Sequence, residues 1–456
     1  MKFDFTNAVG DNVKDGVSVE KVKSISGKLH DFLESFRKSP PGFVRVLDDS
    51  SEIEKVTEFA KRYRKFQNFV SVGIGGSALG IQAIQSALLS PRWNSLSYEE
   101  REHHPRLFVM DNVDPERVNS ILEAIDPSET VFNVISKSGS TAETMANYMI
   151  VRGLLESRGI EPKSHIVFTT DPNEGVLRKI SIDEEIPSLE IPSNVGGRFS
   201  VLTPVGLLSS AVMGVDVKSL VEGAKEAVTT FLTQDDTLKN PVLFNAAIHY
   251  LYSEMGKRIS VMMAYSNALY KLADWYRQLW AESLGKERTL TGEVVNAGQT
   301  PVKALGTVDQ HSQVQLYMEG PNDKIITFLR VNKFRKEIRI PKVHKERQEL
   351  SYLGGAKMSK LMNSEQEATA LALVEHGRPN ITLIFERIDA REVGRFFGYY
   401  ESLVTAMGYL YGINTFDQPG VELGKLNTYA LMEREGYESQ RMRIEKMKKT
   451  LKPFVM

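Results

Sequence analysis

The chain of 456 residues is long enough for two or three ordinary domains, and its formal net charge of −1 creates no field that would draw nucleic acid or an anionic membrane to it. The sequence contains no cysteine, which excludes disulfides, thiolate nucleophiles and cysteine-bound metals and agrees with a reducing, cytoplasmic compartment. The eight histidines lack the helical spacing of a zinc motif, so we expect no metal site.

The pattern of residues 1–60 predicts a helical segment, which we expect to pack on the larger of two domains. Charged residues alternate there with apolar positions at helical spacing, as in "VEKVKSISGKLHDFLESFRK". The first residues lack the apolar region of a secretory signal, and nowhere do about 18 apolar residues follow one another as in a membrane span. We therefore expect no membrane anchor.

Residues 61–205 predict a first α/β domain. Short runs rich in valine, isoleucine and phenylalanine alternate there with helical windows; these runs are "NFVSVGIGG", "PRLFVMDN", "ETVFNVISKSG" and "SHIVFTTD". Such runs are typical of strands buried on both faces of a parallel sheet, with the intervening helices covering the faces.

Residues 206–430 repeat this pattern less regularly and predict a second α/β domain. The candidate strands are "RISVMMAYS", "KIITFLRV" and "NITLIFERI", and "ALYKLADWYRQLWAESLG" predicts a helix with a buried aromatic face. Residues 431–456 predict a charged C-terminal helix. The fold class is thus α/β.

Two turns follow candidate strands and have the composition of anion sites. In "VGIGGSALG" (72–80), glycines let the backbone approach a ligand at the start of a helix. Gly73, Gly75 and Ala78 also fit a dinucleotide-binding pattern, but the acidic residue expected about 20 positions later is missing. The glycines therefore leave a structural turn, an anion site and a dinucleotide site open.

The second turn, "SKSGST" (136–141), places hydroxyl groups and exposed amides at the start of the next helical window. This is the chemistry of a phosphate cradle that needs no magnesium ion. An ordinary helix-capping turn has a similar composition, because serine and threonine are favoured at helix N-termini.

Four later segments carry residues that are suited to chemistry. Arg198 follows two glycines and can face a developing oxyanion, and Glu282 ends the aromatic helix as a candidate base. His311 lies in the polar segment "GTVDQHSQVQ", and Gln418 and Lys425 lie in "FDQPGVELGK". Each of these residues also has an ordinary structural reading when it is taken alone.

Taken together, these segments resemble the phosphoglucose isomerase family. "NVGGRFSVLTPVG" and "GINTFDQPGVELGK" resemble its two signature segments, and its other active-site segments are similar, in the same order, to "GIGGSALG", "SKSGSTAET", "AESLGK" and "TVDQHSQ". The resemblance implies two sugar-isomerase (SIS) domains, each a three-layer sandwich of helices around a mainly parallel sheet. It also implies interconversion of glucose 6-phosphate and fructose 6-phosphate, in glycolysis and gluconeogenesis, without metal or organic cofactor.

The resemblance further implies roles for individual residues. Glu282 is the base that moves a proton between C2 and C1, and Arg198 stabilises the charge of the cis-enediolate. His311 and Lys425 open the sugar ring, and the family's histidine comes from the neighbouring subunit, which implies a homodimer. The substrate-binding residues implied are Gly76, Ser77, Ser136, Lys137, Ser138, Gly139, Ser140, Thr141, Gln278 and Gln418. Ser138 and Ser140 stand where some members have threonine or a bulkier residue.

Two other functions compete with this one. A dehydrogenase that uses the glycines at 73–78 to bind NAD would need the acidic ribose contact that is missing. A non-catalytic sugar-phosphate sensor would keep both turns but would have no need of Glu282, Arg198 and the ring-opening pair together.

Overall fold

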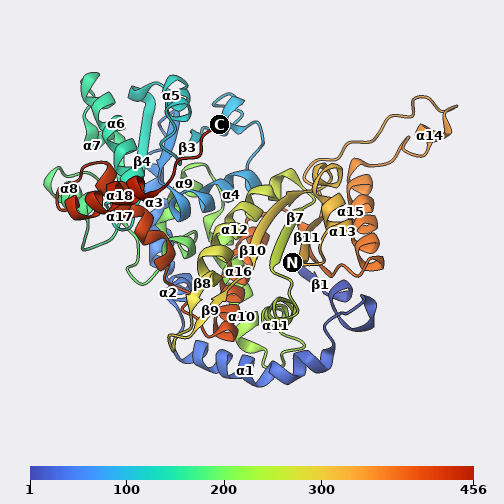
Figure 1. The fold of residues 1–456 in the computed structure, drawn as a ribbon. Coiled ribbons are helices and arrows are strands. Elements are labelled where there is room, and N and C mark those ends of the chain that lie inside the picture. Colours follow the sequence, from blue (N-terminus) through green and yellow to red (C-terminus); the bar gives the residue numbers. More distant parts are fainter.

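The computed structural model describes residues 1–456, apart from the side chain of residue 11. Two five-stranded sheets form its framework, with helices on the faces of each (Figure 1). The first sheet has the order β3-β2-β4-β5-β6, and all its strand pairs are parallel. Its strands are β2 (Asn68–Val72), β3 (Arg106–Met110), β4 (Thr130–Ser136), β5 (Ile166–Thr170) and β6 (Ser188–Glu190).

Both faces of the first sheet are covered, as alternate side chains of β2 show. Phe69 belongs to the apolar core shared with α3, α4 and α9, whereas Val70 and Val72 pack with α5, α6 and α8 on the other face. The helices around this sheet are α3 (Ser50–Lys61), α4 (Leu79–Leu88), α5 (Pro115–Glu123), α6 (Ala142–Ser157), α7 (Pro162–His165), α8 (Val176–Asp183) and α9 (Pro204–Val212).

The second sheet has the order β1-β12-β11-β7-β10. Four of its strands are parallel, and the N-terminal strand pairs antiparallel with β12 at the edge. The strands are β1 (Lys2–Asp4), β7 (Ile259–Ala264), β10 (Thr300–Leu305), β11 (Lys324–Lys333) and β12 (Asn380–Arg387). A separate antiparallel hairpin joins β8 (Lys286–Arg288) to β9 (Val294–Ala297).

Helices cover both faces of the second sheet as well. Phe328 packs with α13 and α15 on one face, and Leu329 belongs to the core shared with α10, α11, α12 and α16 on the other. The helices are α10 (Val217–Thr233), α11 (Pro241–Glu254), α12 (Tyr270–Leu284), α13 (Gln313–Glu319), α15 (Met358–Glu375) and α16 (Ala390–Tyr411). The predicted α/β class, with mainly parallel sheets flanked by helices, is confirmed.

The segments outside the two sheets differ in part from the prediction. Residues 1–60 hold the predicted helices α1 (Val19–Lys38), α2 (Gly42–Arg45) and α3, but also the edge strand β1. The helix α9 crosses the boundary predicted at residue 205 and packs on α3 and β2 of the first sheet. The division of the chain into domains stays a prediction.

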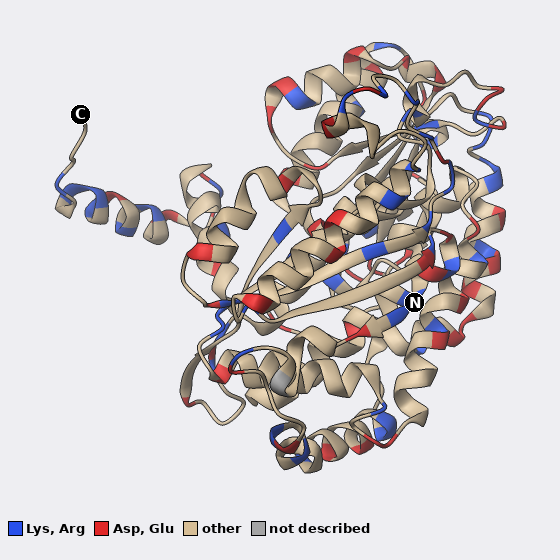
Figure 2. Cartoon of the chain, turned by 90° about the vertical axis from the view of Figure 1, so that its right-hand side faces the viewer, with Lys and Arg blue, Asp and Glu red and all other residues tan. Residues whose placement is uncertain are grey.

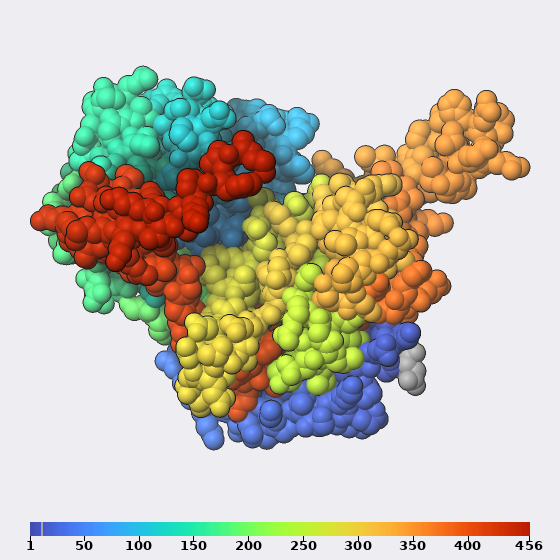
Figure 3. All heavy atoms as spheres, in the orientation of Figure 1, coloured from blue at the N-terminus to red at the C-terminus, as the bar shows by residue number. Residues whose placement is uncertain are grey.

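The C-terminal part forms α17 (Glu422–Leu431) and α18 (Glu438–Thr450), which pack on each other. Figure 2 shows α18, rich in lysine and arginine, extending away from the body. Figure 3 shows this segment in red in front of teal and green residues that surround the first sheet. The stretch around α14 (Gln348–Ser351) protrudes elsewhere (Figures 1 and 3). None of the described helices combines the length and apolarity that crossing a membrane requires.

Candidate active site

The serine-rich turn lies where β4 ends and α6 begins. Ser136 is the last residue of β4 and Thr141 is the N-cap of α6, so the intervening loop faces the free amides of a helix N-terminus. The hydroxyl oxygens of Ser136 and Ser138 lie 3.3 Å and 3.4 Å from Oγ1 of Thr141. Gly139 has a φ of +61°, a conformation that other residues adopt at a cost. The loop therefore gathers three hydroxyls at a position that favours an anion.

A cavity of about 520 Å³ opens at this turn. Its lining comes from five separate stretches of the chain: the glycine turn after β2, the serine-rich turn after β4, the residues that follow β5, the turn at Gly197, and the segment from Gln418 into α17. The lining residues include Gly76, Ser77, Ser136, Lys137, Ser138, Thr141, Asp171, Glu174, Gly197, Gln418 and Lys425. Because the strands are parallel, their carboxyl ends meet at one edge of the sheet, where ligands of such folds bind.

Two predicted substrate contacts in this turn have partners within the protein. The ammonium of Lys137 donates to the carbonyl oxygens of Ser193 (2.7 Å) and Val195 (2.9 Å), and burial lowers the pKa of Lys137. Ser140 turns toward Ser138, since its amide and its hydroxyl both donate to Oγ of that residue. Lys137 thus ties the serine-rich turn to the stretch that leads to Arg198.

The glycine turn brings a second loop against the same stretch. A side chain at Gly76 would place its Cβ 2.1 Å from the carbonyl oxygen of Gly197 and 2.8 Å from the amide nitrogen of Arg198. Only glycine allows two backbones to approach so closely. The turn at 75–77 therefore supports the arginine as well as lining the cavity.

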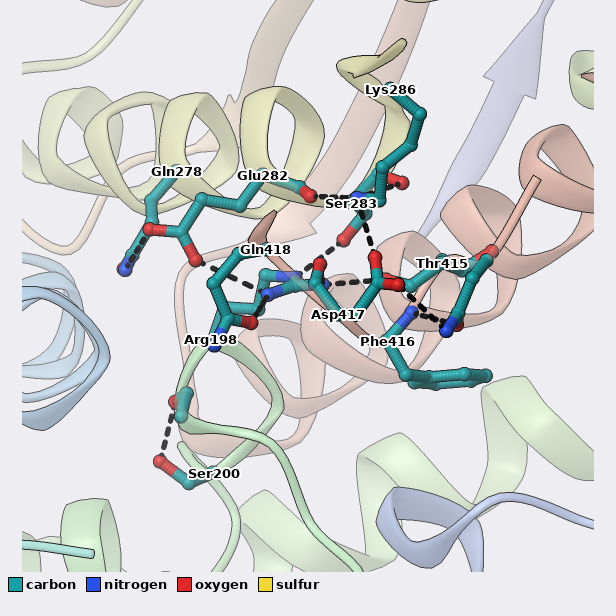
Figure 4. Close-up of polar contacts among 12 residues, drawn as sticks. Arg198, Ser200, Gln278, Glu282, Ser283, Lys286, Thr415, Phe416, Asp417 and Gln418 are labelled. Carbon is teal, nitrogen blue, oxygen red and sulfur yellow. Dashed lines mark hydrogen bonds and ion pairs between the residues drawn. The ribbon is translucent and has the colours of Figure 1, made fainter. Parts of the chain in front are cut away.

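Arg198 is the centre of a hydrogen-bonded cluster in which all five N–H groups of its guanidinium have acceptors (Figure 4). Only 2% of its side chain is exposed. The acceptors are Oγ of Ser283 (2.8 Å), Oε2 of Glu282 (3.3 Å), Oε1 of Gln418 (2.9 Å) and the carbonyl oxygens of Thr415 (2.5 Å) and Asp417 (3.0 Å). Burial lowers the pKa of Arg198, and the charges of Glu282 and Asp417 act against that effect.

Glu282 and Gln278 project from the last turns of α12 (Figure 4). They are four positions apart, so they lie on the same face of the helix, and Nε2 of Gln278 donates to Oε1 of Glu282 at 2.9 Å. The side chain of Glu282 is 34% exposed, in contrast to the enclosed Arg198. A carboxylate held by two side chains and open to solvent on one side can exchange a proton with a bound molecule.

Gln418 connects the cluster to the cavity. Its amide oxygen accepts from Arg198, and the residue also lines the cavity at the serine-rich turn. Lys425 lines the same cavity from α17, where its ammonium lies 2.8 Å from Oε1 of Glu422. A ligand with an anionic end in the cradle could therefore extend past Gln418 toward Glu282.

His311 lies apart from this cluster. It ends the short 3₁₀ turn Val308–His311 and its side chain is exposed. The described contacts do not join it to Arg198 or Glu282 within one chain. Among the described residues, no group of three or more histidine or carboxylate side chains is arranged to hold a metal ion.

The structure adds Lys286, to which we assigned no role from sequence. Its side chain is 5% exposed, its ammonium donates to the carbonyl oxygens of Glu282 and Ser283, and it lies 3.7 Å from Oδ1 of Asp417. Burial, followed by the charge of Arg198, lowers the pKa of Lys286 to about 8. The residue is the last letter of "AESLGK", but nothing in that string reveals that it is buried.

Comparisons with known proteins place the chain in one family. A family model described as phosphoglucose isomerase matches residues 50–445. A protein named glucose-6-phosphate isomerase from Carboxydothermus hydrogenoformans is 44% identical, over 98% of each chain, and one from Rubrobacter xylanophilus is 41% identical, over 96% of this chain and 99% of the relative.

Solved structures match over nearly the same length. The crystal structure of a hypothetical protein from Thermus thermophilus has a TM-score of 0.84 at 33% identity, over 94% of this chain and 99% of that one. A glucose-6-phosphate isomerase from Chlamydia trachomatis has a TM-score of 0.81 at 20% identity, over 97% and 93%, and shares the fold.

Proposed function

The chain belongs to the phosphoglucose isomerase family, and we propose that Glu282, Arg198 and the serine-rich cradle carry out the family's reaction here. The protein is an aldose–ketose isomerase that interconverts glucose 6-phosphate and fructose 6-phosphate, a step of glycolysis and gluconeogenesis. One observation carries the assignment of the site. The guanidinium of Arg198 holds both Glu282 and Gln418, and Gln418 also lines the cavity at the cradle.

The cradle binds the phosphate group of the sugar. The hydroxyls of Ser136, Ser138 and Thr141 and the free amides at the start of α6 are donors that suit a dianion. The phosphate does not react, so its binding energy serves to orient the distant C1–C2 bond at Glu282.

Glu282 moves the proton. The carboxylate takes the proton from C2 of the open-chain aldose, the C–H electron pair forms the C1=C2 bond, and the carbonyl electrons move to O1. Return of that proton to C1, with transfer of the O2 proton to O1, forms the C2 carbonyl of the ketose. Gln278 orients the carboxylate through its 2.9 Å hydrogen bond.

Arg198 stabilises the cis-enediolate. Its Nη1 already donates to Glu282 and Gln418, and these two acceptors lie on its more open side. The carbonyl acceptors and Ser283 hold the rest of the guanidinium in place, so the charge is fixed before the oxyanion forms.

The base role is tested with Glu282→Gln, a change that keeps the shape of the side chain. We expect isomerisation and exchange of the C2 proton with deuterated water to fall together, by about 10²-fold or more. Glu287→Gln, on a nearby exposed carboxylate, is the matched control. Near-normal exchange in Glu282→Gln would remove this residue from the base role.

Ring opening requires an acid–base pair, for which Lys425 and His311 are the candidates. Lys425 lines the cavity, whereas exposed His311 would have to come from a second copy of the chain. A homodimer follows from this assignment. The absence of cysteine and the glycolytic reaction support a cytoplasmic location.

The shared site is tested by mixing two inactive variants, His311→Ala and Glu282→Gln, under conditions that exchange subunits. Half of the dimers would be mixed, and each would hold one intact site, so about a quarter of the wild-type activity should return. Activity that stays absent after subunit exchange has been verified would place His311 outside the neighbouring site.

A further inference from the structure

Lys286 is a buried cation that the proposed reaction does not use. It is the first residue of β8 and follows the end of α12 by two positions. Its ammonium donates to the carbonyl oxygens of Glu282 and Ser283, which belong to the last turn of that helix. The last carbonyls of a helix have no partner within it and carry partial negative charge, so a cation there fixes the turn.

The same ammonium reaches the loop that carries Gln418. It lies 3.7 Å from Oδ1 of Asp417, whose backbone carbonyl accepts from Arg198 at 3.0 Å. The next residue, Gln418, accepts from the same guanidinium. Lys286 therefore stands between the helix end that presents Glu282 and the loop that presents Gln418 (Figure 4).

We propose that Lys286 is a positioning residue, which ties the end of α12 to the loop 414–418 so that Glu282 and Gln418 keep their places on Arg198. Without the tie, the loop and the helix end can shift relative to each other. A displacement of about 1 Å in a catalytic arrangement can cost about 10²-fold in rate. This inference rests on the role proposed for Glu282.

The tie depends on the charge of Lys286. The charged groups that face it are Arg198, Glu282 and Asp417, while Glu287 and Arg288 of its own strand are exposed and pair with each other. Burial and the positive Arg198 hold the pKa of Lys286 at about 8, below the usual 10.5. As the pH rises through this value the ammonium loses its proton, and with it one donor and the attraction to Asp417.

The direction of the stability effect is opposite to that of the rate. The pKa of Lys286 is lower in the folded protein than in the unfolded chain, so the folded state binds fewer protons between about pH 8 and about pH 10.5. The contribution of this group to stability therefore rises with pH in that window, while the tie weakens. If the fall in rate at alkaline pH came from unfolding, stability would have to fall over the same pH range, whereas this group makes stability rise there.

The experiment compares Lys286→Met and Lys286→Arg with the wild type. kcat and KM for fructose 6-phosphate are measured from about pH 6.5 to about pH 9.5, with thermal midpoints at each pH. We expect Lys286→Met to lower kcat about tenfold or more, to change KM less than about threefold because the cradle is intact, and to lose the fall in rate near pH 8. Lys286→Arg stays charged, so it should restore most of the rate and move the alkaline fall upward. Arg288→Met, an exposed cation on the same strand, is the matched control.

A wild-type kcat in Lys286→Met, or an alkaline fall that stays at the same pH in that variant, would overturn the proposal. If Lys286→Met has a lowered thermal midpoint, its lower rate could come from lost stability, and Asp417→Asn then separates the two causes. This change removes the charge that faces Lys286, from a half-exposed position. Its rate should fall in the same direction, and an unchanged rate would overturn the tie. Retained exchange of the C2 proton in Glu282→Gln would refute only the role of Glu282 as the base. The fall in rate of Lys286→Met at alkaline pH is a separate measurement, so the two failures can be told apart.

Discussion

Replacing Arg198 with lysine keeps the positive charge at the centre of its hydrogen-bonded cluster but removes the planar arrangement of donors. The guanidinium uses five N–H groups on five oxygen acceptors, which are spread over two segments of the chain. An ammonium has three donors at a single point. At least two of the five acceptors must therefore lose their donor in Arg198→Lys.

The size of the effect follows from where these acceptors lie. Oγ of Ser283 and the carbonyl oxygen of Thr415 are the buried acceptors of the guanidinium. An unsatisfied buried acceptor costs about 1–3 kcal/mol, so a variant that leaves both without a donor should lose about 2–6 kcal/mol of unfolding free energy. Loss of a well-placed donor to a developing oxyanion costs about 10²–10³-fold in kcat.

The rate is measured from fructose 6-phosphate by coupling formation of glucose 6-phosphate to reduction of NADP by a dehydrogenase, and stability is measured by urea unfolding. Arg288→Lys, which makes the same chemical change at an exposed arginine, should leave both values close to wild type. A folded Arg198→Lys protein with kcat within about threefold of wild type would show that charge alone suffices, and would refute the argument from donor geometry.

Three further predictions concern the cradle, the glycine turn and acid stability. Replacing Ser136 and Thr141 together with alanine should lower kcat/KM by about 10–100-fold and weaken binding of inorganic phosphate, while the thermal midpoint changes little; unchanged kinetics would make the loop an ordinary helix cap. Gly76→Ala forces a Cβ against a facing carbonyl oxygen and should cost about 10²-fold in rate, whereas Gly196→Ala, whose Cβ meets only ordinary contacts, should stay within about threefold; similar rates in both variants would contradict the close approach. Hydrogen bonds from two arginines of α16 lower the pKa of Glu226 to about 2, so its contribution to stability is present above about pH 4.5 and is lost as the pH falls toward 2. Glu226→Gln should thus unfold at lower urea at neutral pH, and its difference from wild type should shrink over that range; a difference independent of pH would contradict this.

Much of the fold was predictable because strands buried on both faces leave a strong local pattern. All seven residues of β4 are buried, and the run of β-branched and aromatic residues in that segment reports this directly. The strands β1, β6 and β8 escaped prediction, since three residues are too few to show a period. β1 and β6 join the two large sheets by pairing with β12 and β5, which no local window contains, whereas β8 pairs with nearby β9 in a hairpin outside both sheets.

The candidate site divides in the same way. The anion-binding character of the turn at 136–141 could be predicted from sequence, because hydroxyl side chains and the flexible glycine backbone act within a few residues of their own position. The roles of Glu282 and His311 came from the family resemblance and stay predictions. Neither source indicated that the ammonium of Lys137 is occupied by two backbone carbonyls.

What the sequence determined by itself was therefore local: which segments are strands or helices, which turns suit an anion, and which side chains have suitable chemistry. Only the tertiary structure decided that Arg198 and Gln418, 220 positions apart, share a hydrogen bond, and that Lys286 is buried between Glu282 and Asp417. The physical reason is that burial and hydrogen-bond partners depend on which distant segments pack together. Burial and hydrogen-bond partners also set the pKa of Lys286 and the fixed charge at Arg198 on which the proposed chemistry rests.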